Sequence, residues 1–178
     1  MERSYQLPLS LEERKEIRSG DYVLLSGIVY TARDAAHQRM WEAMEKGEPL
    51  PIDIKEQCIY YLGPSPSRPG NVIGSAGPTT SSRMDKYTPL MLDAGLALMI
   101  GKGKRNKEVK ESICKNNSIY FAAVGGAGAL LSQCIKSAKI VAYEDLGTEA
   151  IRKLEVVNLP VIAIIDTTGN DLYERGNQ

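Results

Sequence analysis

The sequence predicts an α/β fold in which a sheet of mixed or parallel strands is flanked by helices. From residue 96 onward, short apolar segments typical of strands alternate with helix-forming segments across short connections. The first half of the chain is predicted to be richer in strand and less regular than a doubly wound sheet. With 178 residues, the chain is long enough to bury a core, and we expect one domain over residues 1–178.

Local sequence patterns place the elements of the first half. Ser10 and Glu13 have the spacing of a capping box, and Gly20 follows the end of the same predicted helix. Ser26–Gly27 is expected to bend a strand, and Pro89 to break or kink a helix. The predicted segments are helices at 10–18, 33–45 and 80–92, strands at 21–30, 58–62 and 72–75, and a loop rich in Pro and Ser at 63–70, either ordered or a mobile lid.

The second half shows the more regular alternation of strands and helices. The predicted segments are strands at 96–100, 118–124, 139–143 and 161–166, helices at 107–115, 126–135 and 148–153, and a turn at 167–170 that leads into 171–173. Alternation of this kind with short loops favours parallel pairing of the strands.

The overall composition excludes several classes of function. Lys plus Arg and Asp plus Glu both number 22, so no excess charge favours nucleic acid or an anionic membrane as partner. No apolar run approaches the ~20 residues of a membrane helix, and the first eight residues lack the apolar core of a signal peptide. Cys58, Cys114 and Cys134 are far apart and form no CxxC pair, so we expect this chain to bind no metal. These observations predict a soluble cytoplasmic protein.

Three cations, Arg33, Arg83 and Lys102, each follow a predicted strand. In open α/β sheets, ligands bind beyond the carboxyl ends of the strands. Two of the three segments also open predicted helices, whose free N–H groups attract anions. Arginine offers a fork that matches a carboxylate, and lysine offers a point charge. Together these residues would suit a small dianion with a carboxylate at each end.

Residue spacing adds two further candidates. Thr79 lies four residues before Arg83, and His37 lies four residues after Arg33, so each pair shares a face if the segment is helical. Thr79 is a candidate proton-transfer group, although a lone threonine hydroxyl is a poor base and needs a charged neighbour. Thr80 is expected to cap the following helix through its hydroxyl.

Each candidate also has a purely structural interpretation. Arginines at the start of helices often lie in solvent or bind local carbonyl groups, and His37 would then be an ordinary helix residue. Lys102 belongs to a charged run with Lys104, Arg105 and Lys107, and such runs are typical of a solvated face.

A glycine-rich segment at 124–131, VGGAGALL, indicates a different class of function. It follows a predicted strand, opens a predicted helix and precedes the acids Glu144 and Asp145, as a dinucleotide fingerprint does. However, a G-x-G-x-x-G motif that begins at Gly126 would need glycine where Leu131 stands. Little sheet is predicted to follow this segment, which also weakens the dinucleotide interpretation.

Several longer segments carry a resemblance to a known family. They are ARDAAH (32–37), GSAGPTTSSRMDKYTP (74–89), GKG (101–103), YFAAVGGAGALL (120–131) and YEDLGTEAIRKLEV (143–156). In these segments the chain resembles the C-terminal domain of class I fumarate hydratases. In split members of the family this domain is a separate β-subunit. The resemblance runs from about residue 7 to residue 173, and GPTTSxRMD is a specific part of it. The related β-subunit of tartrate dehydratase shares the pattern.

The resemblance implies a swivelling β/β/α domain that docks on a larger α-subunit, in an assembly expected to be α2β2. The α-subunit would carry a [4Fe-4S] cluster on three cysteines, with one iron open to substrate, and this chain alone would bind no cofactor. The implied reaction is the reversible hydration of fumarate to (S)-malate.

The resemblance also implies roles at the matching positions. Arg33, Arg83 and Lys102 would bind the substrate carboxylates. Thr79 would transfer the proton, activated by an aspartate of the partner chain. The residues expected to support this group without touching substrate are Asp34, His37 and Ser81. The segment that follows Arg83 and the DLGTEAI stretch look more like the fumarate branch.

Two alternatives remain open. The chain could be the β-subunit of a tartrate dehydratase, which converts tartrate to oxaloacetate. It could also be a non-catalytic module that binds an anion or a dinucleotide.

Overall fold

The computed structural model describes residues 3–67, 69–124 and 128–175 and has a mixed α/β fold, as predicted. Its strands are β1 (Arg3–Gln6), β2 (Tyr22–Thr31), β3 (Cys58–Tyr60), β4 (Leu98–Gly101), β5 (Ile119–Ala123), β6 (Ile135–Ala142) and β7 (Ile151–Ile165). Its α-helices are α1 (Leu11–Glu16), α2 (Asp34–Glu45), α3 (Thr88–Asp93), α4 (Lys107–Asn116), α5 (Gly128–Ser132) and α6 (Leu172–Arg175). Two 3-10 helices, η1 (Ser81–Met84) and η2 (Glu144–Glu149), complete the described elements.

The described strands form one mixed sheet in the order β1-β2-β3-β4-β5-β7-β6. Neighbours from β1 to β5 pair in parallel, whereas β7 runs antiparallel to β5, β6 and β2. Because β7 also pairs with β2, strands β2, β3, β4, β5 and β7 close into a barrel-like ring. Closure depends on the length of β7, whose first part pairs with β6 and whose last part pairs with β5.

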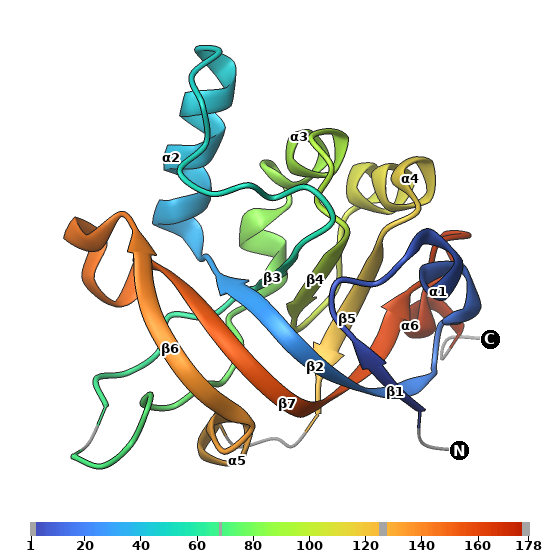
Figure 1. Cartoon of the computed structure of the whole chain (residues 1–178). Helices are drawn as coiled ribbons and strands as arrows, with labels where there is room; N and C mark the ends of the chain where they lie inside the picture. Colours follow the sequence, from blue (N-terminus) through green and yellow to red (C-terminus); the bar gives the residue numbers. More distant parts are fainter. Residues whose placement is uncertain (1–2, 68, 125–127, 176–178) are drawn as a thin grey trace.

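Side chains of successive strand residues alternate between two hydrophobic clusters. In β4, Leu98 and Ile100 belong to a cluster inside the ring, together with alternate residues of β2, β3, β5 and β7. Met99 belongs to the second cluster, which lies between the outer face of the ring and α2, α3 and α4. Figure 1 shows these three helices along one side of the sheet, with the end of α2 projecting from the body.

Local patterns predicted the first half of the chain well, with three errors. The capping box at Ser10 and Glu13 is present, and the register of β2 shifts between Leu25 and Gly27, where the bend was expected. Strand β1 was missed, and the strand predicted at 72–75 is wrong, because these residues form bends without strand pairing. The helix predicted at 80–92 is also wrong as one element. It is divided into η1 and α3, with Pro89 in the first turn of α3, where its missing N–H costs nothing.

In the second half of the chain, the structure differs from the prediction where sheet pairing outweighs helix propensity. The helix predicted at 148–153 is wrong: 144–149 form η2, and β7 begins at Ile151. Gly147 has φ 61° and ψ −118°, which interrupts regular helix there. Ile151, Leu154 and Val156 are buried, so extended backbone places more apolar surface in the core than a helix would. The helix predicted at 126–135 is shorter, because α5 ends at Ser132; its first residues, 126–127, lie outside the described residues.

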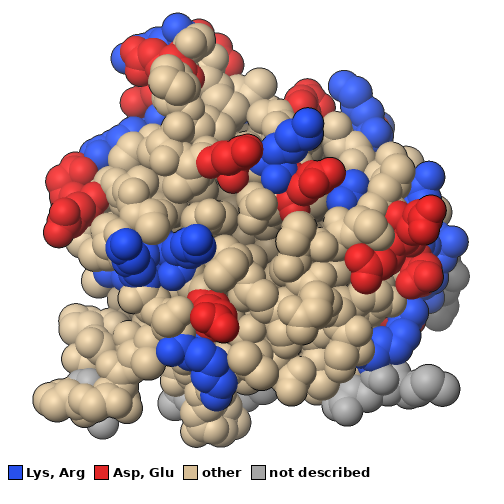
Figure 2. Space-filling model, in the orientation of Figure 1, with Lys and Arg blue, Asp and Glu red and all other residues tan. Residues whose placement is uncertain are grey.

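The surface in view in Figure 2 carries positive and negative side chains interspersed, consistent with the equal totals of 22 each. Within the described part of the chain, no helix has the length and apolar character needed to cross a membrane.

Candidate functional site

The carboxyl ends of neighbouring parallel strands bring the predicted site segments together. β2, β3 and β4 pair in parallel, so they end at the same edge of the sheet. Arg33 follows β2 and is the N-cap of α2, and Lys102 follows β4. The segment that carries Thr79 joins them, because the Thr79 N–H donates to the Tyr61 carbonyl at 2.8 Å and Thr80 forms a β-bridge with Lys102.

Thr79, Arg83 and Asp34 are joined by direct side-chain contacts. Nη2 of Arg83 donates to Oγ1 of Thr79 at 2.9 Å. Nε and Nη2 of Arg83 also donate to the two carboxylate oxygens of Asp34, at 2.8 and 3.0 Å. The hydrogen bond from Arg83 to Asp34 raises the pKa of Arg83. Partial burial opposes ionisation of Asp34, but the bonds from Arg83 lower the pKa of this carboxyl overall. A threonine hydroxyl therefore lies against a fixed cation.

Arg33 lies beside this group and, in the described part of the chain, has a buried donor without a partner. Its Nε is buried and, among the described residues, has no hydrogen-bond partner. The nearest carboxylate oxygens are Oδ1 of Asp34 at 3.6 Å and Oε1 of Glu149 at 4.0 Å. The side chain passes close over Gly63, where a Cβ would lie 2.5 Å from Cδ of Arg33. A buried guanidinium N–H without a partner is costly, and the side chain as a whole is 28% exposed.

Glu149 is a residue of this site that sequence reasoning missed. Its Oε1 accepts from the N–H of Ala35 in the first turn of α2 at 3.1 Å. Arg33, as N-cap, makes no side-chain capping bond, so a residue 114 positions away satisfies this amide instead. No spacing pattern could have found a contact between such distant segments, and the expected helix at 148–153 gave Glu149 no particular role.

Ser81 ties the Lys102 segment to the Thr79 segment. Its Oγ accepts from the Lys102 N–H at 2.9 Å, and its own N–H donates to the Lys102 carbonyl at 2.9 Å. The Tyr120 hydroxyl lies 2.8 Å from Oγ of Ser81 and 2.8 Å from the Gly103 carbonyl oxygen. Because a carbonyl can only accept, Tyr120 donates to Gly103 and Ser81 donates to Tyr120. This chain of bonds holds the backbone of Lys102, whose side chain is exposed.

His37 lies behind Arg33, with its side chain buried. Its Nδ1 is 2.9 Å from the Arg33 carbonyl oxygen, so Nδ1 carries a proton and donates. The imidazole contacts the rings of Tyr61 and Tyr87. Burial lowers the pKa of His37 to about 4, so the ring is neutral at physiological pH. This hydrogen bond joins the His37 side chain to the backbone of Arg33.

The run from Lys102 to Lys107 was expected to be solvated throughout, and this prediction is wrong for Arg105. Its side chain is fully buried, and Nε donates to Oδ1 of Asp85 at 2.6 Å. Nη2 donates to the hydroxyls of Tyr61 and Thr88 at 3.1 and 2.8 Å. The other oxygen of Asp85 accepts from the backbone N–H of the residue after Arg105 at 2.9 Å. This ion pair joins the segment that carries Arg83 to the segment that carries Lys102.

The cysteines do not fit a metal cluster in this chain. Cys58 is buried inside the ring, where burial raises the pKa of its thiol and disfavours the thiolate that binds metal. Cys114 is exposed on α4, and Cys134 contacts the Asn158 carbonyl. In the part of the chain that the structure describes, no group of three His, Cys, Asp or Glu side chains could hold a metal ion.

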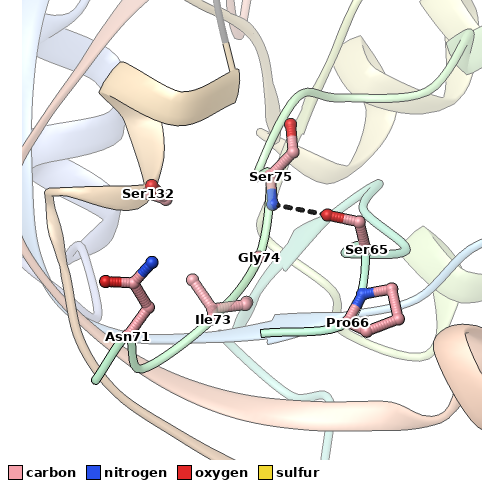
Figure 3. Close-up of a pocket in the computed structure, with 7 residues that line it drawn as sticks. All are labelled: Ser65, Pro66, Asn71, Ile73, Gly74, Ser75 and Ser132. Atoms are coloured by element: carbon pink, nitrogen blue, oxygen red, sulfur yellow. Dashed lines mark hydrogen bonds between the residues drawn. The ribbon is translucent and has the colours of Figure 1, made fainter. Parts of the chain in front are cut away.

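A separate cavity of about 250 Å³ lies over the loop that follows β3 (Figure 3). Ser65 accepts from the Ser75 N–H at 2.8 Å, which joins the two limbs of this loop. The lining residues are Ser65, Pro66, Asn71, Ile73, Gly74, Ser75 and Ser132. None of these has an ionisable side chain, so the cavity suits anion chemistry less well than the cluster at Thr79.

The glycine-rich segment at 124–131 packs closely against the rest of the chain. A Cβ at Gly128 would lie 2.1 Å from Oγ of Ser75 and 2.5 Å from the backbone nitrogen of Gly77. Helix α5 spans only Gly128–Ser132, and β6, which follows it, pairs antiparallel with β7. A dinucleotide fingerprint requires a βαβ unit with a parallel second strand, and this geometry differs from it. Residues 125–127 lie outside the described residues.

The comparisons with known proteins all point to one family. The family model described as "Fumarase C-terminus" matches residues 4–176. The chain is 40% identical over 153 residues to the aerobic class I fumarate hydratase of Escherichia coli (strain K12), an alignment that covers 85% of this chain and 28% of that protein. It is 39% identical over 158 residues to fumarate hydratase 2 of Leishmania major, covering 88% of this chain and 28% of that protein.

A third relative has a length similar to that of this chain. The chain is 36% identical over 176 residues to the putative L(+)-tartrate dehydratase subunit beta of Methanocaldococcus jannaschii, covering 96% of this chain and 90% of that protein. The chain thus spans 28% of the length of the two fumarate hydratases but most of the length of the separate subunit.

Proposed function

Because this chain belongs to the fumarase C-terminus family, we propose that it is the β-subunit of a cytoplasmic hydro-lyase that converts fumarate to (S)-malate and back. Its active site would be completed by a larger α-subunit, in an α2β2 assembly. The observation that carries the proposal is the contact between Nη2 of Arg83 and Oγ1 of Thr79 at 2.9 Å, with Asp34 holding the same guanidinium through Nε and Nη2.

Thr79 is proposed to move the proton at C3 of the substrate. A threonine hydroxyl is a weak base, so its use depends on stabilising negative charge at Oγ1. The guanidinium of Arg83 donates to that oxygen and is held in place by a bidentate bond to Asp34. Preorganised donors of this kind are most effective where charge develops in the transition state. We place the group that accepts the proton of Thr79 itself in the partner subunit.

Arg33 and Lys102 are proposed to bind the substrate carboxylates. Removal of the C3 proton loads negative charge onto the adjacent carboxylate, which fixed cations stabilise. Arg33 offers a partly exposed guanidinium, and Lys102 adds an exposed ammonium beyond the end of β4, which β3 separates from β2 in the sheet. Ser81 and His37 act on these two residues through their backbones.

The [4Fe-4S] cluster implied by the family resemblance is proposed to lie in the partner subunit. The position and burial of Cys58, Cys114 and Cys134 do not suit a cluster in this chain. When bound, such a cluster supplies a Lewis acid for the hydroxyl and carboxylate at the other end of the substrate.

The exposure of the site supports a second chain over it. The side chains of Arg83 and Asp34 are 46% and 40% exposed, and that of Arg33 is 28% exposed. Charged groups stabilise a transition state best where water is excluded. A partner that covers this surface would supply that exclusion.

The test is the activity of this chain with and without its partner, under anaerobic conditions with iron and sulfide. We expect the complex to hydrate fumarate and this chain alone to show neither turnover nor cluster absorbance. Turnover with a cluster spectrum from this chain alone would contradict the two-subunit proposal.

A tartrate dehydratase subunit is the second candidate. It is favoured by one observation, the match of the chain to most of the length of the putative tartrate dehydratase subunit beta. The ratio of kcat/KM for (S)-malate to that for L(+)-tartrate, measured on the same complex, separates the two. A ratio well below one would show that the substrate is tartrate and not fumarate. The proposed site geometry would stay the same.

A further inference from the structure

Two carboxylates, those of Asp34 and Glu149, lie near the guanidinium of Arg33, but neither is within hydrogen-bonding distance of its Nε. Asp34 is committed to Arg83 through both carboxylate oxygens, at 2.8 and 3.0 Å. Glu149 is therefore the carboxylate left to offset the charge of Arg33, and its Oε1 lies 4.0 Å from the unpartnered Nε. At that separation the pair attracts but forms no hydrogen bond.

The position of Glu149 is set by a different contact. Its Oε1 accepts from the N–H of Ala35, at the first turn of the 12-residue helix α2. The side chain is 29% exposed, and η2 is joined to α2 through this bond. Gly63 leaves room for Arg33 beside η2, because a Cβ there would lie 3.2 Å from the Thr148 carbonyl oxygen as well as against Arg33. Arg33 is thus enclosed by Gly63, Asp34 and Glu149.

We propose that Glu149 is a positioning residue that sets the affinity of Arg33 for dicarboxylates. This rests on the proposed function, in which Arg33 binds a substrate carboxylate. The bond to Ala35 fixes the start of α2 and with it the backbone of Arg33. The negative charge, by contrast, offsets the field of Arg33 and opposes a second carboxylate at the same guanidinium.

Two substitutions separate these effects. Glu149→Gln keeps an oxygen that can accept from the Ala35 N–H but removes the charge. Glu149→Ala removes both. Glu144→Gln is a matched control, because Glu144 lies on the same 3-10 helix, is exposed and loses the same charge.

The measurement is steady-state fumarate hydration by the two-subunit complex at low and high salt, together with melting curves. For Glu149→Gln at low salt we expect KM to fall about two- to fivefold, the range for one partly exposed ion pair, with kcat within about twofold. The difference from wild type should shrink at ~0.5 M salt, because screening weakens charge effects but not packing. Glu149→Ala should lower the melting temperature, and Glu144→Gln should match wild type.

Any of three kinetic outcomes would overturn the inference: an unchanged KM in Glu149→Gln, a shift that salt does not reduce, or an equal shift in Glu144→Gln. A fall in the melting temperature of Glu149→Gln would also count against it, since the amide is expected to keep the bond to Ala35. An inactive wild-type complex would instead contradict the proposed function itself, which keeps the two failures distinct.

Discussion

Ser81 and Lys102 exchange two hydrogen bonds, one from the Lys102 N–H to Oγ of Ser81 and one from the Ser81 N–H to the Lys102 carbonyl, each 2.9 Å long. The Thr79 segment and the end of β4 are therefore tied at a single buried serine. Gly101 allows this approach, since a Cβ there would lie 2.0 Å from Oγ of Ser81. The position of the Lys102 backbone is thus coupled to that of the Thr79 segment.

Ser81→Ala should reduce both stability and activity. It leaves the Lys102 N–H without its hydrogen-bond acceptor and removes one of the two contacts of the Tyr120 hydroxyl, at a cost of about 1–3 kcal/mol in the free energy of unfolding. Displacement of Lys102 should lower kcat/KM for fumarate by about tenfold or more. Denaturant unfolding and kinetics of the complex measure the two effects. Ser82→Ala, at an exposed neighbour, should change neither, and an equal result for both variants would exclude a role for Ser81.

Arg105→Met should destabilise the chain strongly. The substitution leaves the buried carboxylate of Asp85 without its ion-pair partner, and breaking a buried pair costs about 3–5 kcal/mol. Urea unfolding of the isolated chain gives the change. Lys104→Met, one residue away and exposed, is the control and should stay within about 0.5 kcal/mol of wild type. A similarly small change for Arg105→Met would show that the pair contributes no stability.

His37 should make the free energy of unfolding depend on pH between about 6.5 and 4. Burial lowers the pKa of His37 to about 4, so in this range the unfolded chain binds a proton that the folded chain does not. Stability therefore falls as pH falls through this window, by about 3 kcal/mol for this residue alone. His37→Asn keeps a donor for the Arg33 carbonyl but does not titrate.

Unfolding of wild type and His37→Asn at a series of pH values tests this. The charged groups that act on the ring, Arg105 and Asp34, are common to both proteins. We expect the variant to lose most of the slope between pH 6.5 and 4. The same slope in both proteins would contradict a buried neutral histidine.

The sequence predicted those parts of the fold that local chemistry determines. The capping box at Ser10 and the glycine bend in β2 depend on neighbouring residues and were found. The ring was not found, because it depends on pairing between β2 and β7, which are more than 100 residues apart. A helix was predicted at 148–153, but Ile151 is buried when residues 151–153 are extended and pair with β6.

The sequence predicted that the segments of Arg33, Arg83 and Lys102 lie at strand ends, but it predicted individual side-chain contacts only within one segment. Thr79 and Arg83 lie in contact, as their spacing suggested, although Thr79 precedes η1 and is not on a shared helix. The expected capping by Thr80 is wrong, because its side chain makes no capping bond. The roles of Glu149 and Arg105 depend on partners from distant segments, and their sequence surroundings resemble ordinary surface helix and charged loop.

The most direct test of the account is the turnover of fumarate by complexes that carry Thr79→Val or Thr80→Val. Valine keeps the shape of Thr79 but removes the oxygen that Arg83 contacts at 2.9 Å. Turnover by Thr79→Val should fall by ~10²-fold or more, the scale for a lost acid–base group, with an unchanged melting temperature. Thr80 is exposed and makes no capping bond, so Thr80→Val should retain both activity and stability. Equal turnover by Thr79→Val and wild type would contradict the account and remove Thr79 from the mechanism.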